Sequence, residues 1–481
     1  MTLTIVGLGP GSVDDLTRRA WRALEHASVV YLRTSQHPCV PYLPAGPDYR
    51  SFDEVYESSG DFEHIYTVIV GQVLEAARQA SVVYAVPGDP RVAESTVTRL
   101  LAAAQGLHIE VISGISFIEP ALRLLGIDAL DGLQILDALD VAALHHPPIN
   151  PDYPALLGQV YNRAVASDLK LTLMNQYPDE FEVMLVHRAG ATGEGVERLP
   201  LYEMDHSVRI QHLTALYVPP LGGMSSFERF QETIAHLRAP EGCPWDRQQT
   251  HRSLRKYLLE EAHEVLEAID VEDPAALREE LGDLLLQIGL HVQIAVDDGE
   301  FQMADVLSAI NHKLIRRHPH VWGAVDVDGA EQVVANWEAI KREERTASGE
   351  QQHASLLDGI PKGLPALLQA YEYTARAAKP GFDWPNVEQV VAKVREELEE
   401  VLRAPDADAR AEEIGDLLFV IVNWARWLNV EPESALRAAN AKFSRRFQFI
   451  ERAAAAQGRS LSDWSLDEMD ALWEQAKAQG L

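Results

Sequence analysis

The stretch Leu258-Leu-Glu-Glu-Ala-His-Glu264, followed by Arg278-Glu-Glu-Leu-Gly-Asp283, decides the fold of the second half of the chain. Each segment carries acids three or four positions apart, which share one face of an α-helix. The residues between the acids are largely apolar and recur with the period of a helix that packs against a neighbour. A short connection at Pro274 makes the two helices antiparallel neighbours, so we expect their acidic faces to meet.

Acids gathered in this way need a compensating charge. Carboxylates that face one another repel unless a cation lies between them, and a set of oxygen ligands favours magnesium or manganese over zinc. An acid-rich helix is often no more than a solvated face, but here the acids interrupt the apolar stripe and the whole pattern recurs. The acids that would meet are Glu260, Glu261, Glu264, Glu280 and Asp283.

The same pattern occurs a second time further along the chain. Arg395-Glu-Glu-Leu-Glu-Glu400 repeats the first acidic segment, and Ala411-Glu-Glu-Ile-Gly-Asp416 repeats the second. A basic segment follows each acidic pair, Asn311–Arg317 in the first copy and Asn440–Arg446 in the second. An internal duplication that keeps acidic and basic residues in order indicates a repeated functional unit.

The composition narrows the classes of partner. The chain of 481 residues has 42 Lys and Arg against 73 Asp and Glu, a net charge of −31. This charge argues against nucleic acid and against an anionic membrane surface as partners, but not against a small anion that arrives with its own metal ions. Cys39 and Cys243 lie far apart, so we expect neither a disulfide framework nor a Cys-based metal site. No apolar stretch reaches about 18 residues and no signal peptide is evident, so we expect a cytoplasmic protein.

Short apolar runs alternate with helical patterns over residues 1–220, which is typical of α/β layers. The runs that resemble strands are Thr2–Val6, Ser28–Leu32, Val82–Val86, Ile109–Ser113, Lys170–Met174 and His212–Val218. The helical patterns are Asp14–Glu25, Ile65–Gln79, Glu94–Gln105, Phe117–Leu125 and Pro154–Ala166.

Glycine turns follow three of these strands. Gly7-Leu-Gly-Pro-Gly11 lacks the GxGxxG spacing of a dinucleotide loop, and Pro10 removes a backbone donor, so a nicotinamide site is not expected. The other two turns are Val86-Pro-Gly-Asp-Pro90 and Ser113-Gly-Ile-Ser-Phe117. Loops that leave the carboxyl ends of neighbouring strands converge on one crevice, where open sheets bind ligands.

These turns, together with Leu213-Thr-Ala-Leu216, make residues 1–220 resemble the tetrapyrrole methylases. The resemblance implies two α/β halves with S-adenosylmethionine in the cleft between them. It also implies that the cofactor is held by Gly9, Pro10, Gly88, Asp89, Val92, Ala93, Ser116, Phe117 and Thr214. Ala93 stands where many of these methylases have glycine, and no acid–base pair is evident. The sequence therefore leaves open whether this domain transfers a methyl group or is a retained scaffold.

The Pro/Gly/Ser-rich segment 218–226 marks the domain boundary, and strand patterns almost vanish after it. The second half is similar to the MazG family of nucleoside triphosphate pyrophosphohydrolases. The segments that carry this resemblance are Gly242-Cys-Pro-Trp-Asp246, Gln249-Thr250, Glu260–Glu264, Glu280–Asp283, Lys313–His320, Leu357–Pro365, Gly381-Phe-Asp-Trp384, Glu396–Glu400 and Glu413–Asp416. We therefore expect all-α domains at 226–345 (copy 1) and 365–481 (copy 2), joined by a linker at 346–364.

The resemblance implies a four-helix metal site in a homodimer that hydrolyses NTP or dNTP to the monophosphate and pyrophosphate. The implied Mg²⁺ or Mn²⁺ ligands are Glu261, Glu264, Glu280 and Asp283 in copy 1 and Glu397, Glu400, Glu413 and Asp416 in copy 2. Glu260 and Glu396 would be further carboxylates beside these ligands.

The charges suggest a mechanism, because a triphosphate cannot approach several carboxylates unless divalent ions bridge them. We expect an activated water to attack the α-phosphorus in line, with Glu260 or Glu264 as the acceptor of its proton. In each copy, basic side chains that share one face of the helix after the acidic segments would neutralise the β- and γ-phosphates. These are Lys313, Arg316 and Arg317 in copy 1 and Lys442, Arg445 and Arg446 in copy 2. They could instead form a solvated face paired with local acids.

Other residues near these segments have simpler explanations. Trp245 and Trp384 could stack on a base, but packing in the core is the more common role. His318 and His320 are interpreted as structural, because the acids already account for the metal. Copy 1 keeps the longer Arg-Arg-His-Pro-His run and is the slightly better candidate for catalysis, and one of the two copies could serve mainly as a dimerisation or regulatory unit.

Three hypotheses follow from the sequence. The first is an NTP pyrophosphohydrolase with a methylase-like domain attached. The second is a methyltransferase whose helical half serves for oligomerisation or nucleotide sensing. The third is a nucleotide sensor without turnover.

Overall fold

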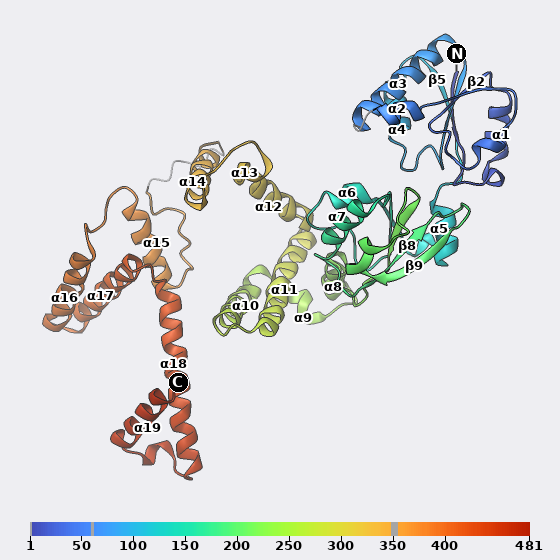
Figure 1. The fold of residues 1–481 in the computed structure, drawn as a ribbon. Coiled ribbons are helices and arrows are strands. Elements are labelled where there is room, and N and C mark those ends of the chain that lie inside the picture. Colours follow the sequence, from blue (N-terminus) through green and yellow to red (C-terminus); the bar gives the residue numbers. More distant parts are fainter. Residues whose placement is uncertain (1, 59–61, 348–354) are drawn as a thin grey trace. The chain divides into compact units, whose positions relative to one another are not determined.

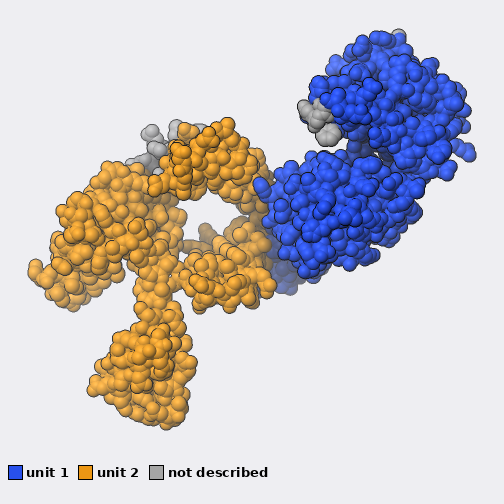
Figure 2. Space-filling model, in the orientation of Figure 1, with its two compact units in different colours: residues 1–248 blue, residues 249–481 orange. Residues whose placement is uncertain are grey.

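The computed structural model describes residues 2–58, 62–347 and 355–481. The chain divides into two compact units, residues 1–248 and 249–481 (Figures 1 and 2). The first contains both β-sheets and the second is helical, which confirms the expected order of an α/β domain followed by all-α domains. Among the described residues, no helix combines the length and apolarity that a membrane crossing requires.

The first sheet is parallel and has the strand order β3-β2-β4-β1-β5. Its strands are β1 (Thr2–Gly7), β2 (Val29–Leu32), β3 (Asp48–Ser51), β4 (Val82–Val86) and β5 (His108–Ile112). Every residue of β4 is buried, because helices cover both faces of a parallel sheet. The glycine loops after β1, β4 and β5 leave the same edge of this sheet.

The second sheet has the order β6-β7-β10-β8-β9, with β6 and β7 parallel and the other neighbours antiparallel. Its strands are β6 (Gln134–Asp137), β7 (Ala155–Gly158), β8 (Glu182–His187), β9 (Gly195–Pro200) and β10 (Thr214–Val218). The two sheets form the two α/β halves that the sequence predicts.

The helices of the first unit surround these sheets. They are α1 (Arg18–Glu25), α2 (Asp53–Ser58), α3 (Phe62–Gln79), α4 (Ser95–Ala103), α5 (Ile118–Leu125), α6 (Ala138–Ala142), α7 (Arg163–Leu173), α8 (Phe227–Arg238) and α9 (Pro244–Gln248). The helix expected from Asp14 begins only at Arg18, because Thr17 caps it by accepting a hydrogen bond from the backbone N of Ala20. Val13–Asp15 forms a separate 3₁₀ turn.

Two predicted elements of this unit are wrong. The expected helix from Pro154 to Ala166 begins as strand β7, and the expected strand at Lys170–Met174 lies almost wholly within α7. The side chain of Asn162 starts α7 by accepting a hydrogen bond from the backbone N of Val165. Ala166, Leu169 and Leu173 are buried along one face of that helix, a stripe that outweighs the local β-like alternation.

The second unit consists of helices, and each of its two copies contains a packed pair of helices that is followed by further helices (Figure 1). Copy 1 continues with α10 (His251–Asp270), α11 (Pro274–Asp298), α12 (Met303–Arg317), α13 (Pro319–Trp322) and α14 (Ala330–Ala347). Copy 2 contains α15 (Ala366–Ala378), α16 (Val387–Arg403), α17 (Ala407–Trp427), α18 (Pro432–Ala456) and α19 (Leu466–Ala478).

An antiparallel hairpin carries the acids in each copy. Helices α10 and α11 pack along each other, as do α16 and α17. Local sequence sets the start of each second helix: Asp273 caps α11, whose first residue is Pro274, and Asp406 caps α17. The hairpins therefore form where the sequence predicts them.

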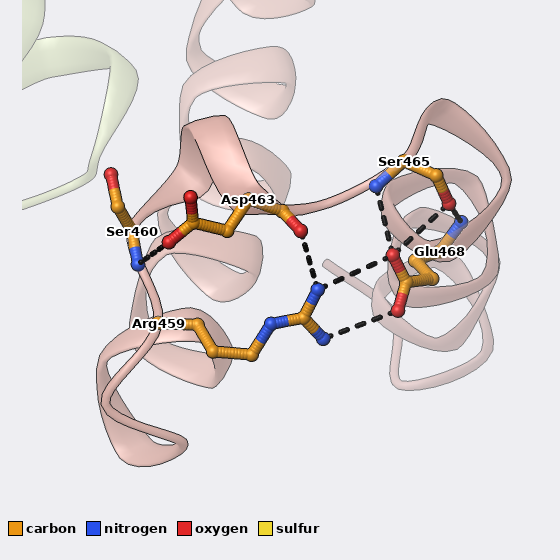
Figure 3. A network of polar contacts seen from close by, with 5 residues as sticks. All are labelled: Arg459, Ser460, Asp463, Ser465 and Glu468. Carbon is orange, nitrogen blue, oxygen red and sulfur yellow. Dashed lines mark hydrogen bonds and ion pairs between the residues drawn. The ribbon is translucent and has the colours of Figure 1, made fainter.

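Helix α19 begins with a capping box (Figure 3). The backbone N of Ser465 donates to Oε2 of Glu468 at 2.8 Å, and the backbone N of Glu468 donates to the Ser465 hydroxyl at 3.3 Å. Arg459 adds an ion pair with Glu468 at 3.2 Å. These bonds lower the pKa of Glu468 to about 2 and fix the last helix to the segment that precedes it.

Candidate functional site

The glycine loops after β1, β4 and β5 meet at the edge of the first sheet. The backbones of Gly9 and Gly88 exchange two hydrogen bonds, at 2.8 and 3.2 Å. A Cβ on Gly7 would lie 2.7 Å from the backbone N of Gly114, so only glycine permits this approach. The carboxylate of Asp89 then accepts a hydrogen bond from the backbone N of Gly114 at 3.1 Å. The crevice expected from the three turns is therefore present.

A cavity opens beside these loops and extends to the second sheet. Its lining includes most of the residues predicted to hold a cofactor: Pro10, Gly88, Asp89, Val92, Ala93, Ser116, Phe117 and Thr214. The remaining predicted residue, Gly9, is hydrogen-bonded to the lining residue Gly88. The predicted set does not contain five other polar lining residues, Arg33, His37, Glu94, Gln159 and His212.

Two lining residues other than glycine have backbones in the left-handed region. The φ angle is +55° at Ala93 and +67° at Gln159, a conformation that non-glycine residues adopt at a cost. Ala93 stands where many tetrapyrrole methylases have glycine, and the positive φ angle gives a physical reason for that preference. Strain of this kind is concentrated at functional sites.

A buried ion pair joins Arg33 to Glu94 at the wall of the cavity. The Arg33 Nε also donates to the Tyr56 hydroxyl at 3.0 Å, and Glu94 accepts from Thr96 at 3.1 Å. Burial raises the pKa of Glu94, and the neighbouring guanidinium opposes that shift. Burial also lowers the pKa of His37.

The acidic cluster of copy 1 lies where α10 and α11 face each other. Carboxylate oxygens of Glu261, Glu264 and Glu280 lie within 4.8 Å of one another. Asp283 is close enough to act on Glu261 and Glu280, since burial and the Asp283 and Glu264 charges raise the pKa of both residues. Glu260 is exposed beside this cluster. The structure therefore brings the predicted acids of copy 1 together.

Gln287 closes one end of the copy 1 cluster. It is 5% exposed, and its Nε2 donates to Oε1 of Glu261 at 3.4 Å. Its own Oε1 is buried without a hydrogen-bond partner, so a neutral oxygen also lies unsatisfied near the carboxylates. The sequence missed this residue because glutamine in an apolar stripe carries no charge signal.

The copy 2 cluster has the corresponding place between α16 and α17. Carboxylate oxygens of Glu397, Glu413 and Asp416 lie within 4.8 Å of one another. Burial and the charges of Glu400 and Glu397 raise the pKa of Glu413, which places Glu400 beside the group. Glu397 is only 5% exposed. Lys393 reaches this cluster from the same helix, a feature that the sequence did not single out.

Among the described residues, no ion pair or hydrogen bond joins either basic segment to the acidic cluster of its own copy. In copy 1, Arg316 and Arg317 share the carboxylate of Glu344 on α14, at 2.7 and 2.6 Å. These bonds lower the pKa of Glu344. Lys313 is exposed on α12, the helix that carries the two arginines. The alternative of cations paired with a local acid therefore describes the two arginines of copy 1.

The basic segment of copy 2 has different partners. The Arg446 Nε donates to the backbone oxygen of Leu481 at 2.6 Å, and its guanidinium lies 5.5 Å from the ring centroid of Trp473. In the described part of the chain, neither Lys442 nor Arg445 has an acidic partner. The two copies therefore differ in how much of their positive charge is already neutralised.

The two tryptophans differ in exposure, and the two histidines make local contacts. Trp245 is 51% exposed, whereas Trp384 is half-buried. His318 bonds the backbone oxygen of Leu314 at 2.7 Å and lies against His320 and Trp322. A structural role for the two histidines remains the prediction.

The acidic clusters fit a hard divalent cation chemically. Their ligand atoms are oxygens that come from two paired helices, and burial together with mutual repulsion raises the pKa of Glu261 and of Glu413. The unsatisfied Oε1 of Gln287 adds a neutral oxygen at copy 1. Such a set suits Mg²⁺ or Mn²⁺ better than a cation that prefers nitrogen or sulfur.

Both halves of the chain are similar to known protein families. Residues 2–205 match the model of the tetrapyrrole (corrin/porphyrin) methylases, and residues 249–322 match the MazG nucleotide pyrophosphohydrolase domain. A uroporphyrin-III-C-methyltransferase structure from Thermus thermophilus is 24% identical, with a TM-score of 0.36, and the match covers 46% of this chain and 92% of that one.

Relatives extend the match to the whole chain. The Bacillus subtilis protein YabN is 43% identical over 486 residues, which cover 99% of this chain and 98% of YabN. The nucleoside triphosphate pyrophosphohydrolase of Escherichia coli is 45% identical over 262 residues, which cover 53% of this chain and 98% of that protein. The chain therefore belongs to the MazG nucleotide pyrophosphohydrolase family and carries a tetrapyrrole methylase domain ahead of its helical half.

Proposed function

We propose that the helical half hydrolyses nucleoside triphosphates to the monophosphate and pyrophosphate in the presence of Mg²⁺ or Mn²⁺. The observation that carries the proposal is the gathering of Glu261, Glu264 and Glu280 within 4.8 Å on two paired helices. A relative whose name states this activity is 45% identical over the corresponding length. A cytoplasmic location is part of the proposal.

The proposed ligands are the predicted acids of each copy: Glu261, Glu264, Glu280 and Asp283 in copy 1, and Glu397, Glu400, Glu413 and Asp416 in copy 2. Divalent ions held there would neutralise phosphate charge and make water a better nucleophile. Glu260 is exposed beside the copy 1 cluster, so it is our first candidate to accept the proton of the attacking water, with Glu264 as the second.

The basic segments would bind the outer phosphates. In copy 2, Lys442 and Arg445 are exposed and suited to that role. In copy 1, a phosphate would have to replace Glu344 as the partner of Arg316 and Arg317, with Lys313 beside them.

A homodimer belongs to the proposal because the helical half exposes apolar side chains. Leu281, Ile288 and Leu314 are 49%, 41% and 43% exposed. Packing of these faces against a second copy would remove the apolar surface from water. Sedimentation at several protein concentrations tests this part directly.

The test of the hydrolase uses the full chain with each NTP and dNTP and Mg²⁺. We expect pyrophosphate and the monophosphate as products, and strong loss of product when EDTA is present. A protein that binds nucleotides tightly but turns none over at any Mg²⁺ concentration would instead support a sensor.

A second candidate function concerns the cavity of the first unit, which we propose binds S-adenosylmethionine. The strained backbones of Ala93 and Gln159 at its wall favour a ligand site over an idle scaffold. Calorimetry with S-adenosylmethionine and S-adenosylhomocysteine is the test. Binding of neither compound would reject this second function and leave the hydrolase untouched.

A further inference from the structure

The copy 2 cluster contains a cation of its own. The Nζ of Lys393 lies 2.8 Å from Oε1 of Glu396 and 2.8 Å from Oε1 of Glu397. The side chain of Glu397 is 6% exposed, and its carboxylate is one of the three that lie within 4.8 Å of one another. The ammonium group is therefore hydrogen-bonded to a proposed metal ligand.

Copy 1 has no such cation at the corresponding position. When Glu396 is matched to Glu260, the residue three positions earlier is Lys393 in copy 2 and Tyr257 in copy 1. The neighbouring Lys256 lies with its Nζ 4.4 Å from the Tyr257 ring centroid. Within the described ranges, no Lys or Arg forms an ion pair with the copy 1 cluster.

The two clusters therefore differ in net charge although they share their acids. A unit positive charge at hydrogen-bond distance cancels much of the potential that draws a divalent ion to a carboxylate. An incoming ion that uses Glu397 must also share or displace the bond from Lys393. The bond from Lys393 also holds the buried Glu397 carboxylate in place when no metal is bound. The positive charge of Lys393 lowers the repulsion between the carboxylates of the cluster.

We propose that Lys393 is a built-in counter-ion of the second acidic site, so that copy 2 binds divalent ions more weakly than copy 1. This inference rests on the proposed function in so far as the clusters hold divalent ions. Lys393 acts here as a positioning residue for Glu396 and Glu397. It gives one chain two metal sites with different working concentrations.

The test is titration of the full chain with Mn²⁺, followed by electron paramagnetic resonance and calorimetry, without nucleotide. We expect two classes of site. Lys393→Met should tighten the weaker class about tenfold, because the competing charge is gone. Tyr257→Lys, the reciprocal change, should weaken the tighter class by a similar factor. Lys393→Arg keeps the charge and should leave both classes close to the wild-type values.

Melting of each variant without metal and with saturating Mn²⁺ provides the folding control. Lys393→Met should melt earlier without metal and recover with Mn²⁺, because Glu397 then loses its partner. If Lys393→Met does not fold, Lys393→Gln takes its place, and it should bind Mn²⁺ more tightly at the weaker class of site to the same extent. Unchanged or weaker Mn²⁺ binding in the folded variant would overturn the inference.

The outcome separates this inference from the hydrolase proposal. Two unequal classes of site that respond to these substitutions, without hydrolysis, would reject the hydrolase and retain the counter-ion. Hydrolysis with two equal classes that ignore Lys393 would do the reverse. Absence of Mn²⁺ binding at both copies would reject both.

Discussion

The two copies of the helical unit carry the same acids but place their cations differently. In copy 1 the acidic cluster has no basic partner in the described structure, while Glu344 neutralises Arg316 and Arg317. In copy 2, Lys393 lies within the cluster, while Lys442 and Arg445 have no acidic partner in the same described regions. Two sites with the same ligands can therefore differ in function, because the charges around the ligands differ.

The largest expected effect comes from removing one ligand in each copy. Glu280→Gln and Glu413→Gln preserve size but remove a charged ligand from copy 1 and copy 2, respectively. We expect the double variant to lose at least about 100-fold in kcat, since loss of residues that merely support a metal site already costs about 10- to 100-fold.

The two single variants apportion the activity between the copies. A copy that performs the reaction alone should reproduce the loss of the double variant when its own ligand is changed. Steady-state pyrophosphate release is the measurement. A double variant with wild-type turnover would show that neither cluster carries the reaction.

A second contrast between the copies is the anchor at Asp383. Its carboxylate accepts bonds from Arg426 at 2.7 Å and from the Trp427 indole at 3.0 Å. Copy 1 has Pro244 at the matching position of its Gly-Cys-Pro-Trp segment. Asp383→Asn should therefore destabilise copy 2 by about 1–2 kcal/mol, the effect of weakening a charged hydrogen bond that solvent partly screens.

The pH dependence of this effect has a defined sign. Burial opposes ionisation of Asp383, but the bonds from Arg426 and Trp427 outweigh it and hold the pKa below its usual value. The stabilisation is therefore present above the unfolded pKa of about 3.9 and is lost as pH falls through the folded value. The difference in urea stability between wild type and variant should be full at pH 7 and should shrink as the pH falls below about 3.9. A difference that stays constant as the pH falls would rule out the ionic anchor.

The smallest effect is expected at the Glu344 contact of copy 1. Glu344→Gln leaves Arg316 and Arg317 without a carboxylate, so inorganic triphosphate should bind copy 1 about fivefold more tightly, which corresponds to about 1 kcal/mol. Calorimetry in a Lys442→Ala, Arg445→Ala background, which removes the exposed basic side chains of copy 2, isolates this copy. Glu343→Gln, an exposed neighbour on the same helix, is the matched control and should change nothing. Weaker binding in Glu344→Gln would mean that Glu344 aligns the arginines instead of competing for them.

The sequence predicts those parts of the site that depend on local spacing. Glu261, Glu264 and Glu280 follow helical periods within one hairpin, and their approach in the structure agrees with that pattern. Lys393 also lies three and four positions before Glu396 and Glu397, so helical spacing alone contained the signal for it. The prediction missed Lys393 because it considered only the acidic residues of the cluster.

Contacts between distant segments could not be predicted in this way. Glu344 reaches Arg316 from another helix, and the Arg33–Glu94 pair joins the end of β2 to the residue that precedes α4. The sequence also predicts the wrong element types for β7 and α7. The buried run Ala155–Gly158 is too short to show a period that distinguishes a strand from a helix. Tertiary packing decides such cases.

The most direct test of the central claim is hydrolysis of ATP by the full chain with Mg²⁺ in water enriched in ¹⁸O, read by ³¹P nuclear magnetic resonance and mass spectrometry. Attack at the α-phosphorus places the ¹⁸O in the nucleoside monophosphate and releases unlabelled pyrophosphate. Label in the pyrophosphate, release of nucleoside diphosphate and orthophosphate, or no turnover at any Mg²⁺ concentration would contradict the account.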